Sequence, residues 1–261
     1  MVKNKNKFEQ FFHNNKGNII NKWDHYFDIY ERHFYKYQNR DIILLEIGVS
    51  NGGSLNMWSN YFGENTKIYG IDIDPRCKEF EKNNIEIFIG SQSDKNFLEK
   101  VKNKIPKVDI LIDDGGHSME QQIITFNTLF SHIKDDGIYL CEDIHTSYWL
   151  YFGGGYKRAG TFIEYSKNFI DRLNAFHSEE KGLKPDNFTR SVDSIHYYDS
   201  VLVLHKMKKN PPKNITSGEI SFGNEKVVNY QTNKKPFIDN YWLMIINKIL
   251  RYFRLKSIIW K

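Results

Sequence analysis

The sequence predicts an α/β fold built on a doubly wound, mainly parallel sheet, and three observations support this. Short apolar runs recur along the first 143 residues, and each one ends in an acidic or glycine-rich cluster. Segments long enough for a helix separate these runs, which is typical of parallel strands covered on both faces. The carboxyl ends of such strands open onto one crevice, where α/β sheets bind their ligands. The four runs are residues 42–47, 68–71, 111–112 and 138–141.

Further patterns complete the sheet. Residues 85–89 form another apolar run, which predicts the third strand. Residues 192–198 and 200–205 predict two strands joined tightly at Asp199, which is an antiparallel hairpin. With the four runs above, these segments give a sheet of seven strands. Helices are expected at residues 96–101, 121–133 and 162–176.

Both ends of the chain predict helices outside the sheet. Residues 19–37 carry aromatic side chains at helical spacing, so an amphipathic helix is expected within an N-terminal segment, 1–40. An aromatic stripe of this kind is usually core, and we prefer that reading to a role in stacking on a cofactor. The main domain is then placed at 41–206, followed by a linker at 207–237 that contains prolines.

The tail, residues 238–261, predicts a basic amphipathic helix. Apolar side chains from Trp242 to Phe253 recur at helical spacing, and Lys248 and Arg251 lie on the other side. We expect this helix to pack on its own domain or on a second subunit, as in a homo-oligomer. An anionic membrane surface is the less favoured partner.

Size, charge and cysteine content set further limits. The chain has 261 residues, 40% of them hydrophobic and 15% aromatic, which suits one α/β domain with appendages. The net charge is only +5 and acidic residues are plentiful, so nucleic acid is not expected as a partner. Cys77 and Cys141 support neither a disulfide framework nor a thiolate metal site. The polar, lysine-rich start predicts no signal peptide, and hence a cytoplasmic protein.

A glycine-rich loop follows the first strand and opens the next helix. Glycines there allow a tight turn and close approach to a ligand, and the helix start offers unpaired backbone donors. About 20 residues on, Asp72 ends the next strand, where a carboxylate can hold the ribose hydroxyls of a nucleoside. A dinucleotide-binding fingerprint fits poorly, and an acid before the first glycine suits a cofactor that carries an ammonium group. The loop residues predicted to bind an adenosine cofactor are Glu46, Gly48, Ser50, Gly52 and Ser54.

Acidic side chains also end the fourth and fifth strands. Asp113 and Asp114 close one strand, and Glu142 and Asp143 close the other. Carboxylates brought together without matching cations repel one another, and a divalent ion such as Mg²⁺ with oxygen ligands would resolve this. We expect Asp114, Glu142 and Asp143 to be the metal ligands and His117 to be a general base. The alternative is that these acids only cap turns.

The glycine loop resembles motif I of the class I S-adenosylmethionine methyltransferases, with Glu46, Gly48 and Gly52 in register. That family has a Rossmann-like, seven-stranded sheet that ends in an antiparallel hairpin. The resemblance implies S-adenosylmethionine as the cofactor. It also implies that Ser91 and Gln92, which follow the third strand, seat the adenine, and we group Asp113 with these cofactor-binding residues.

Residues 23–200 resemble a narrower group, the metal-dependent sugar O-methyltransferases of macrolide tailoring (mycinamicin type) and the related cephalosporin hydroxylase-like proteins. The matching segments are 46–54, 114–117 and 142–149. The resemblance implies the same three metal ligands and the same base. It also places His145, Tyr148 and Trp149 beside the acceptor.

The expected activity is therefore O-methylation of a sugar hydroxyl in a glycan, a nucleotide sugar or a glycosylated metabolite. A cation would lower the pKa of this hydroxyl while the base removes its proton. Catechol or phosphoramidate acceptors, and a hydroxylase-like relative of the same fold, are the alternatives. The hydroxylase is disfavoured because the chain shows no clear set of two histidines and one carboxylate for iron.

Overall fold

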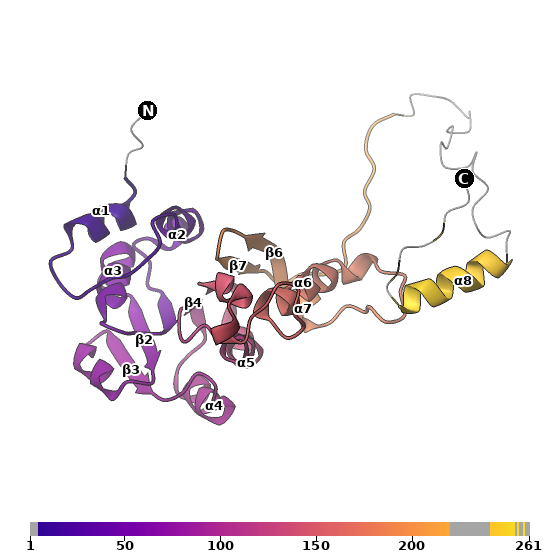
Figure 1. Ribbon diagram of the computed structural model, residues 1–261. Helices are drawn as coiled ribbons and strands as arrows, with labels where there is room; N and C mark the ends of the chain where they lie inside the picture. Colours follow the sequence, from indigo (N-terminus) through magenta and orange to yellow (C-terminus); the bar gives the residue numbers. More distant parts are fainter. Residues whose placement is uncertain (1–4, 220–240, 254, 256–257, 259–261) are drawn as a thin grey trace. The chain divides into compact units, whose positions relative to one another are not determined.

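The computed structural model describes residues 5–219, 241–253, 255 and 258. Contacts divide the chain into two units, Met1–Pro212 and Lys213–Lys261. The first unit contains the whole sheet, and the second contains helix α8 (Tyr241–Tyr252), which confirms the predicted tail helix (Figure 1). Most of the predicted linker, from residue 220 onwards, lies outside the described residues. Within the described segments, every helix is too short or too polar to cross a bilayer.

The predicted seven-stranded sheet is confirmed, with strand order β3-β2-β1-β4-β5-β7-β6. Strands β1 to β5 are parallel, whereas β7 pairs antiparallel with both β5 and β6. From β1 the chain first adds β2 and β3 on one side, and then adds β4 and β5 on the other side. A doubly wound sheet opens its ligand crevice at this switch point, between β1 and β4. The strands are β1 (Ile43–Ile47), β2 (Lys67–Asp72), β3 (Ile85–Ile89), β4 (Val108–Asp113), β5 (Ile133–Cys141), β6 (Val192–Tyr197) and β7 (Leu202–Lys206).

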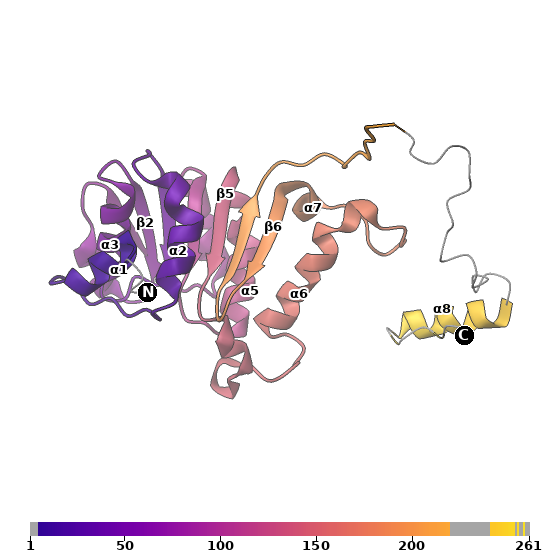
Figure 2. The same ribbon diagram turned by 90° about the horizontal axis from the view of Figure 1, so that it is seen from above.

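Helices cover both faces of the sheet, so two separate cores form (Figures 1 and 2). One core is made with α1 (Lys7–Asn14), α2 (Tyr26–Phe34) and α3 (Gly53–Phe62). The opposite core is made with α4 (Lys95–Lys104), α5 (Met119–Leu129), α6 (Phe162–Leu173) and α7 (Asn187–Ser191). Short 3₁₀ turns are Tyr35–Tyr37, Pro75–Phe80, Phe130–His132, Ile144–Tyr148, Leu150–Phe152 and Ala175–His177.

Three helix boundaries differ from the sequence prediction. The helix expected at 19–37 begins only at Tyr26, and the preceding residues form an irregular segment beside the glycine loop. The helix expected at 121–133 ends at Leu129, because buried Ile133 pairs with Val108 as the first residue of β5. The helix expected at 162–176 ends at Leu173, where a 3₁₀ turn follows.

Helix α1 was not anticipated from the sequence. Its start carries a capping box, in which the Asn6 side chain accepts from the Glu9 amide and the Glu9 carboxylate accepts from the Asn6 amide. Phe8 is fully buried and stacks on Tyr61 of α3, with 3.7 Å between ring centroids. The helix is therefore part of the first core.

Candidate active site

The glycine loop after β1 is shaped by close backbone contacts. Gly48 has φ +93°, and a Cβ atom there would lie 2.0 Å from the carbonyl oxygen of Asp114. Gly52, with φ +71°, caps the start of α3 against the ring of Phe80. Only glycine adopts these conformations in so little space. The loop is thus held directly against the end of β4.

Asp72, at the end of β2, fixes the same loop from the other side. One oxygen of its carboxylate accepts from the backbone amides of Val49 and Ser50, each at 2.8 Å. The other oxygen accepts from the amide of Asp74 at 2.9 Å. Because a carboxylate has about four acceptor positions, Asp72 keeps capacity for a ligand hydroxyl.

A first cavity of about 230 Å³ opens where these elements meet. It lies at the carboxyl ends of β1, β2, β3 and β4, as expected for a nucleoside site. Its lining brings together most of the residues that the sequence assigned to the cofactor. These are Gly48, Ser50, Asp72, Ser91 and Gln92.

Glu46 is fully buried beneath the loop and is partnered within the protein. Its two oxygens accept from Ser54 Oγ at 2.8 Å and from Trp58 Nε1 at 2.9 Å. Burial raises the pKa of Glu46 to about 7, against the opposing effect of Lys22. In this structure Glu46 anchors α3 to β1, and contact with a cofactor ammonium stays a prediction.

Asp113 does not line this first cavity. Its carboxylate accepts from the Gln92 side chain and from the Tyr139 hydroxyl at 3.2 Å. The Gln92 carbonyl in turn accepts from the Gly116 amide at 3.0 Å. Burial raises the pKa of Asp113 to about 8. Asp113 therefore braces the loops that follow β3 and β4, and its geometry gives no support to the expected cofactor contact.

A second cavity, of about 270 Å³, lies on the other side of the glycine loop. Asp114, His117 and Asp143 line it, together with Ser54 and Lys22. The two cavities share four lining residues, so they meet across the glycine loop and the end of β4. The shared residues are Gly48, Ser50, Asp114 and Gly115.

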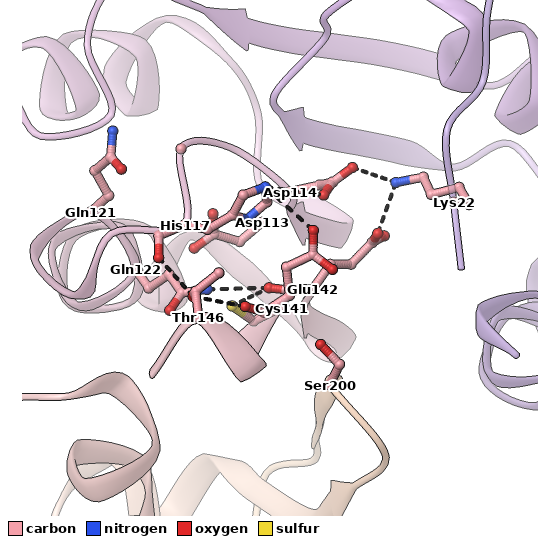
Figure 3. A network of polar contacts seen from close by, with 12 residues as sticks. Lys22, Asp113, Asp114, His117, Gln121, Gln122, Cys141, Glu142, Thr146 and Ser200 are labelled. Carbon is pink, nitrogen blue, oxygen red and sulfur yellow. Dashed lines mark hydrogen bonds and ion pairs between the residues drawn. The ribbon is translucent and has the colours of Figure 1, made fainter. Parts of the chain in front are cut away.

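Lys22, which lines this cavity, reaches between Asp114 and the buried Glu142 (Figure 3). Its ammonium donates to Asp114 Oδ2, and to Glu142 Oε2 at 2.8 Å. The Lys22 and Glu142 side chains are only 3% and 1% exposed, so this is a buried ion pair. Burial alone would lower the pKa of Lys22, but the two carboxylates outweigh it and raise that pKa.

Two tyrosines of α2 complete the partners of the acids. The Tyr30 hydroxyl donates to Glu142 Oε1 at 2.7 Å, and the Tyr26 hydroxyl donates to Asp143 Oδ1 at 2.6 Å. Both oxygens of Glu142 are therefore engaged within the protein. Asp143 keeps its second oxygen facing the imidazole of His117.

His117 lies between Asp114 and Asp143. Its Nε2 is 3.5 Å from Asp143 Oδ2 and 3.9 Å from Asp114 Oδ1. His117 and Asp143 both have left-handed backbone conformations, with φ of 55° and 53°. The Thr146 hydroxyl lies 2.9 Å and 2.8 Å from their carbonyl oxygens and links the two turns. Strained residues held in this way are common at functional sites.

The acids and His117 have shifted pKa values. Burial raises the pKa of Asp114 to about 6 and that of Glu142 to about 7, although Lys22 opposes both shifts. Burial also lowers the pKa of His117, so its imidazole is neutral at pH 7. A neutral imidazole is the form that accepts a proton.

The donor set fits a divalent cation. Ligand atoms of Asp114, His117 and Asp143 lie within 4.8 Å of one another. When Asp114, Glu142 and Asp143 are ionised, the single ammonium of Lys22 balances only part of their charge. Carboxylate oxygens are also the ligands that Mg²⁺ prefers. The expected metal ligands are thus brought together, except that Glu142 faces Lys22 and Tyr30.

Two of the three residues expected beside the acceptor line a third cavity, of about 410 Å³. His145 and Tyr148 line it, together with Ser200, whose hydroxyl is hydrogen-bonded to His145 Nδ1. Trp149 is 50% exposed and packs edge-on against His145, with 4.7 Å between ring centroids. All three predicted residues therefore lie beside the end of β5.

A comparison with protein families identifies this arrangement. Residues 45–144 match the profile of a family described as a methyltransferase domain. This segment is therefore similar to methyltransferase domains. It runs from β1 to the turn after β5 and includes the glycine loop and Asp72. It also includes the four residues that we call the acidic site, which are Asp114, His117, Glu142 and Asp143.

Curated relatives of this chain are named as O-methyltransferases. Demethylmacrocin O-methyltransferase of Streptomyces fradiae is 34% identical over 188 residues, which are 68% of this chain and 47% of the relative. Mycinamicin VI 2''-O-methyltransferase of Micromonospora griseorubida is 33% identical over 190 residues, again 68% of this chain and 47% of the relative. The chain thus spans about half the length of these relatives.

A solved structure shows the same similarity. MycE methyltransferase in complex with Mg, SAH and mycinamycin VI matches 77% of this chain and 53% of its own, with 29% identity and a TM-score of 0.68. Together with the curated relatives, it confirms the resemblance to macrolide sugar O-methyltransferases and the Rossmann-like methyltransferase fold.

Some residues of the site were not assigned from the sequence. Tyr26 and Tyr30 were interpreted only as core, yet their hydroxyls reach the acids. Tyrosine in place of phenylalanine on a buried helix face is the signal, because a buried hydroxyl requires a partner. Lys22 lies in a polar stretch, and four-residue spacing from Tyr26 is the sole hint of its position.

Proposed function

We propose that this chain is an S-adenosylmethionine-dependent O-methyltransferase that methylates a sugar hydroxyl with the help of a divalent cation. The acceptor would be a glycan, a nucleotide sugar or a glycosylated metabolite. The observation that carries the proposal is the junction of the two cavities, where Gly48, Ser50, Asp114 and Gly115 line both. A methyl donor in one cavity would end beside an acidic site in the other. The relatives are named as O-methyltransferases, which supports a hydroxyl acceptor. One relative is named for a rhamnosyl tetracenomycin-C, which supports a sugar.

The first cavity and the glycine loop form the cofactor half of the crevice. This half would bind S-adenosylmethionine through groups that hydrogen bonds within the protein already hold in place. S-adenosylmethionine supplies a methyl group on a sulfonium when bound. Asp72 would accept the ribose hydroxyls while its backbone hydrogen bonds hold the loop, and Ser91 would contact the adenine. The start of α3 would offer backbone donors to the carboxylate of the cofactor.

The second and third cavities form the acceptor half of the crevice. This half would hold the sugar and remove the proton of its hydroxyl. Asp114, Glu142 and Asp143 would hold a divalent cation, which lowers the pKa of an acceptor hydroxyl when bound. His117 would take the proton at Nε2, the nitrogen that faces Asp114 and Asp143. Asp143 would stabilise the imidazolium that results. Any cation would compete with Lys22 for Asp114 and Glu142.

The third cavity would bind the rest of the acceptor. His145 and Tyr148 line it, and Trp149 packs against His145, so polar and aromatic side chains would meet the mixed polar and apolar faces of a sugar ring. Holding the acceptor oxygen in line with the methyl group would supply much of the acceleration.

The proposal is tested by methyl transfer from labelled S-adenosylmethionine to a panel of nucleotide sugars, glycosylated polyketides, glycans and catechols. We expect transfer to at least one sugar acceptor, dependent on Mg²⁺ and on Asp114. Asp171→Asn, an exposed acid on α6, is the matched control and should keep full activity. Transfer to catechol alone would contradict the sugar assignment. Saturable binding of NAD but not of S-adenosylmethionine in titration calorimetry would contradict the cofactor.

A further inference from the structure

Three histidines from separate elements meet outside the methyltransferase site. His33 lies on α2, His196 on β6 and His205 on β7. Their ligand atoms lie within 4.8 Å of one another, and His33 Nδ1 is 2.6 Å from His205 Nε2. His33 is 4% exposed, whereas the other two are partly exposed. Helix packing and hairpin register together create this histidine cluster.

The hairpin register places His196 and His205 on the same face. His196 pairs with Val203 and Ser194 pairs with His205, so the two imidazoles are diagonal neighbours. Their ring centroids are 5.2 Å apart, and each ring lies within 5 Å of the His33 ring. In a tetrahedral site with Zn–N bonds of about 2.0–2.1 Å, ligand nitrogens lie about 3.4 Å apart. Small side-chain rotations would reach this separation.

His33 and His196 each already have a hydrogen-bond partner on Nε2, the nitrogen that we assign to the outside of the cluster. His33 Nε2 is 2.8 Å from the Tyr198 hydroxyl, and His196 Nε2 is 3.0 Å from Ser194 Oγ. Histidines that bind a metal through one nitrogen commonly hydrogen-bond through the other, which fixes the ring. These contacts leave the Nδ1 atoms of His33 and His196 and the Nε2 atom of His205 for a shared ligand.

Burial, together with the charges around the cluster, keeps its imidazoles neutral. Burial lowers the pKa of His33 to about 3 and that of His205 to about 4, and it also lowers the pKa of His196. Arg32 and Lys36 of α2 contribute to the shift, and Asp193 of β6 opposes it for the two hairpin histidines. Neutral imidazole is the form that binds a metal ion.

We propose that His33, His196 and His205 form a zinc site that is separate from the acidic site. Three imidazoles leave a fourth position for water, and imidazole ligands favour zinc over magnesium. The ion would join α2 to the β6–β7 hairpin. Since the preceding turns of α2 carry Tyr26 and Tyr30, zinc at this position would also hold those hydroxyls against the acids.

The test is a Zn²⁺ titration of the full chain against a chromophoric chelator, in excess Mg²⁺ after removal of bound metals. We expect one Zn²⁺ per chain with submicromolar affinity, and an absorption spectrum typical of tetrahedral Co²⁺ when cobalt replaces zinc. His33→Ala and His196→Ala should each weaken binding on the order of 100-fold, because loss of an outer partner alone costs about 10- to 100-fold. Tyr198→Phe should weaken binding about 10-fold.

Two controls separate this site from others. His177→Ala, an exposed histidine, should bind Zn²⁺ as the wild type does. Asp114→Ala should also keep the high-affinity zinc, because it changes only the acidic site. His196 is partly exposed on the edge strand, so its variant should fold, which circular dichroism checks. Wild-type affinity in folded His196→Ala, or zinc that is lost only in Asp114→Ala, would overturn the proposal.

Discussion

The two halves of the crevice hold their carboxylates in different ways. In the cofactor half, Glu46 is partnered by Ser54 and Trp58, which follow it by 8 and 12 residues. In the acceptor half, Glu142 is partnered by Lys22 and Tyr30, which precede it by 120 and 112 residues. The first arrangement is local, whereas the second requires the N-terminal segment to dock on the sheet. We infer that the cofactor half is preformed and that the acceptor half responds to cations.

This difference predicts that changes in one half leave the other nearly intact. Removing groups of the acceptor half should lower turnover with little effect on cofactor affinity. Removing groups of the cofactor half should do the reverse. The following variants test this separation, beginning with the largest effect.

His117→Ala should lower kcat by about 10²- to 10⁴-fold, the usual loss for a positioned general base. Because burial lowers the pKa of His117, the imidazole stays neutral to a lower pH, and the acid limb of kcat/KM for the wild type should lie below 6.5. Steady-state kinetics from pH 4 to 9 measure both, with His177→Ala as the control. Unchanged turnover in His117→Ala would refute its role as the base.

Lys22→Met should destabilise the metal-free protein by about 3–5 kcal/mol, because two buried carboxylates lose their shared ammonium. Mg²⁺ should restore more stability to this variant than to the wild type, since the ion then has less competition. Urea unfolding with and without Mg²⁺ measures the change. Lys100→Met, an exposed lysine on α4, should show neither effect. Equal stabilisation of Lys22→Met and the wild type by Mg²⁺ would show that the ion does not compete with the Lys22 ammonium.

Asp72→Ala should weaken S-adenosylmethionine binding by roughly 1–3 kcal/mol, through loss of ribose hydrogen bonds and of the loop contacts to Val49 and Ser50. At saturating cofactor, kcat should stay close to that of the wild type. Titration calorimetry and saturation kinetics give the two values, with Asp171→Ala as the control. A loss of kcat with unchanged affinity would reverse the assignment of this half.

Truncation after Asn240 should have the smallest effect on catalysis, because α8 belongs to the second unit of the chain. We expect its apolar stripe to pack on protein, and the experiment tests a second subunit as the partner. Truncation should therefore lower the oligomeric state in sedimentation while turnover persists. Retention of the full chain on anionic liposomes, abolished by truncation, would show that lipid is the partner.

The local half of the crevice was predictable from the sequence. In the distant half, the acids and His117 were predictable, but their partners from the N-terminal segment were not. The loop from Glu46 to Ser54 and the strand end at Asp72 follow from short-range patterns, and the structure places them at one cavity or beside it. The seven strands and the final antiparallel hairpin also follow from the apolar runs. Each of these features depends on neighbours in the chain.

Contacts that depend on packing escaped sequence analysis. Lys22 enters the site because the chain between α1 and α2 is irregular rather than helical, whereas the aromatic spacing alone suggested a longer helix. The inward direction of Asp113, towards Gln92 and Tyr139, depends on its place in β4, which a pair of adjacent aspartates cannot reveal. The histidine cluster required the register of β6 with β7 and the docking of α2.

The most direct test of the separation is to measure methyl transfer and S-adenosylmethionine affinity on one EDTA-treated sample. We predict that transfer to the sugar acceptor falls on the order of 10³-fold. The cofactor dissociation constant should stay within about twofold, since the glycine loop and Asp72 need no cation. Added Mg²⁺ should restore the transfer. Full transfer in EDTA would contradict the cation requirement, and a parallel loss of cofactor binding would contradict the separation of the two halves.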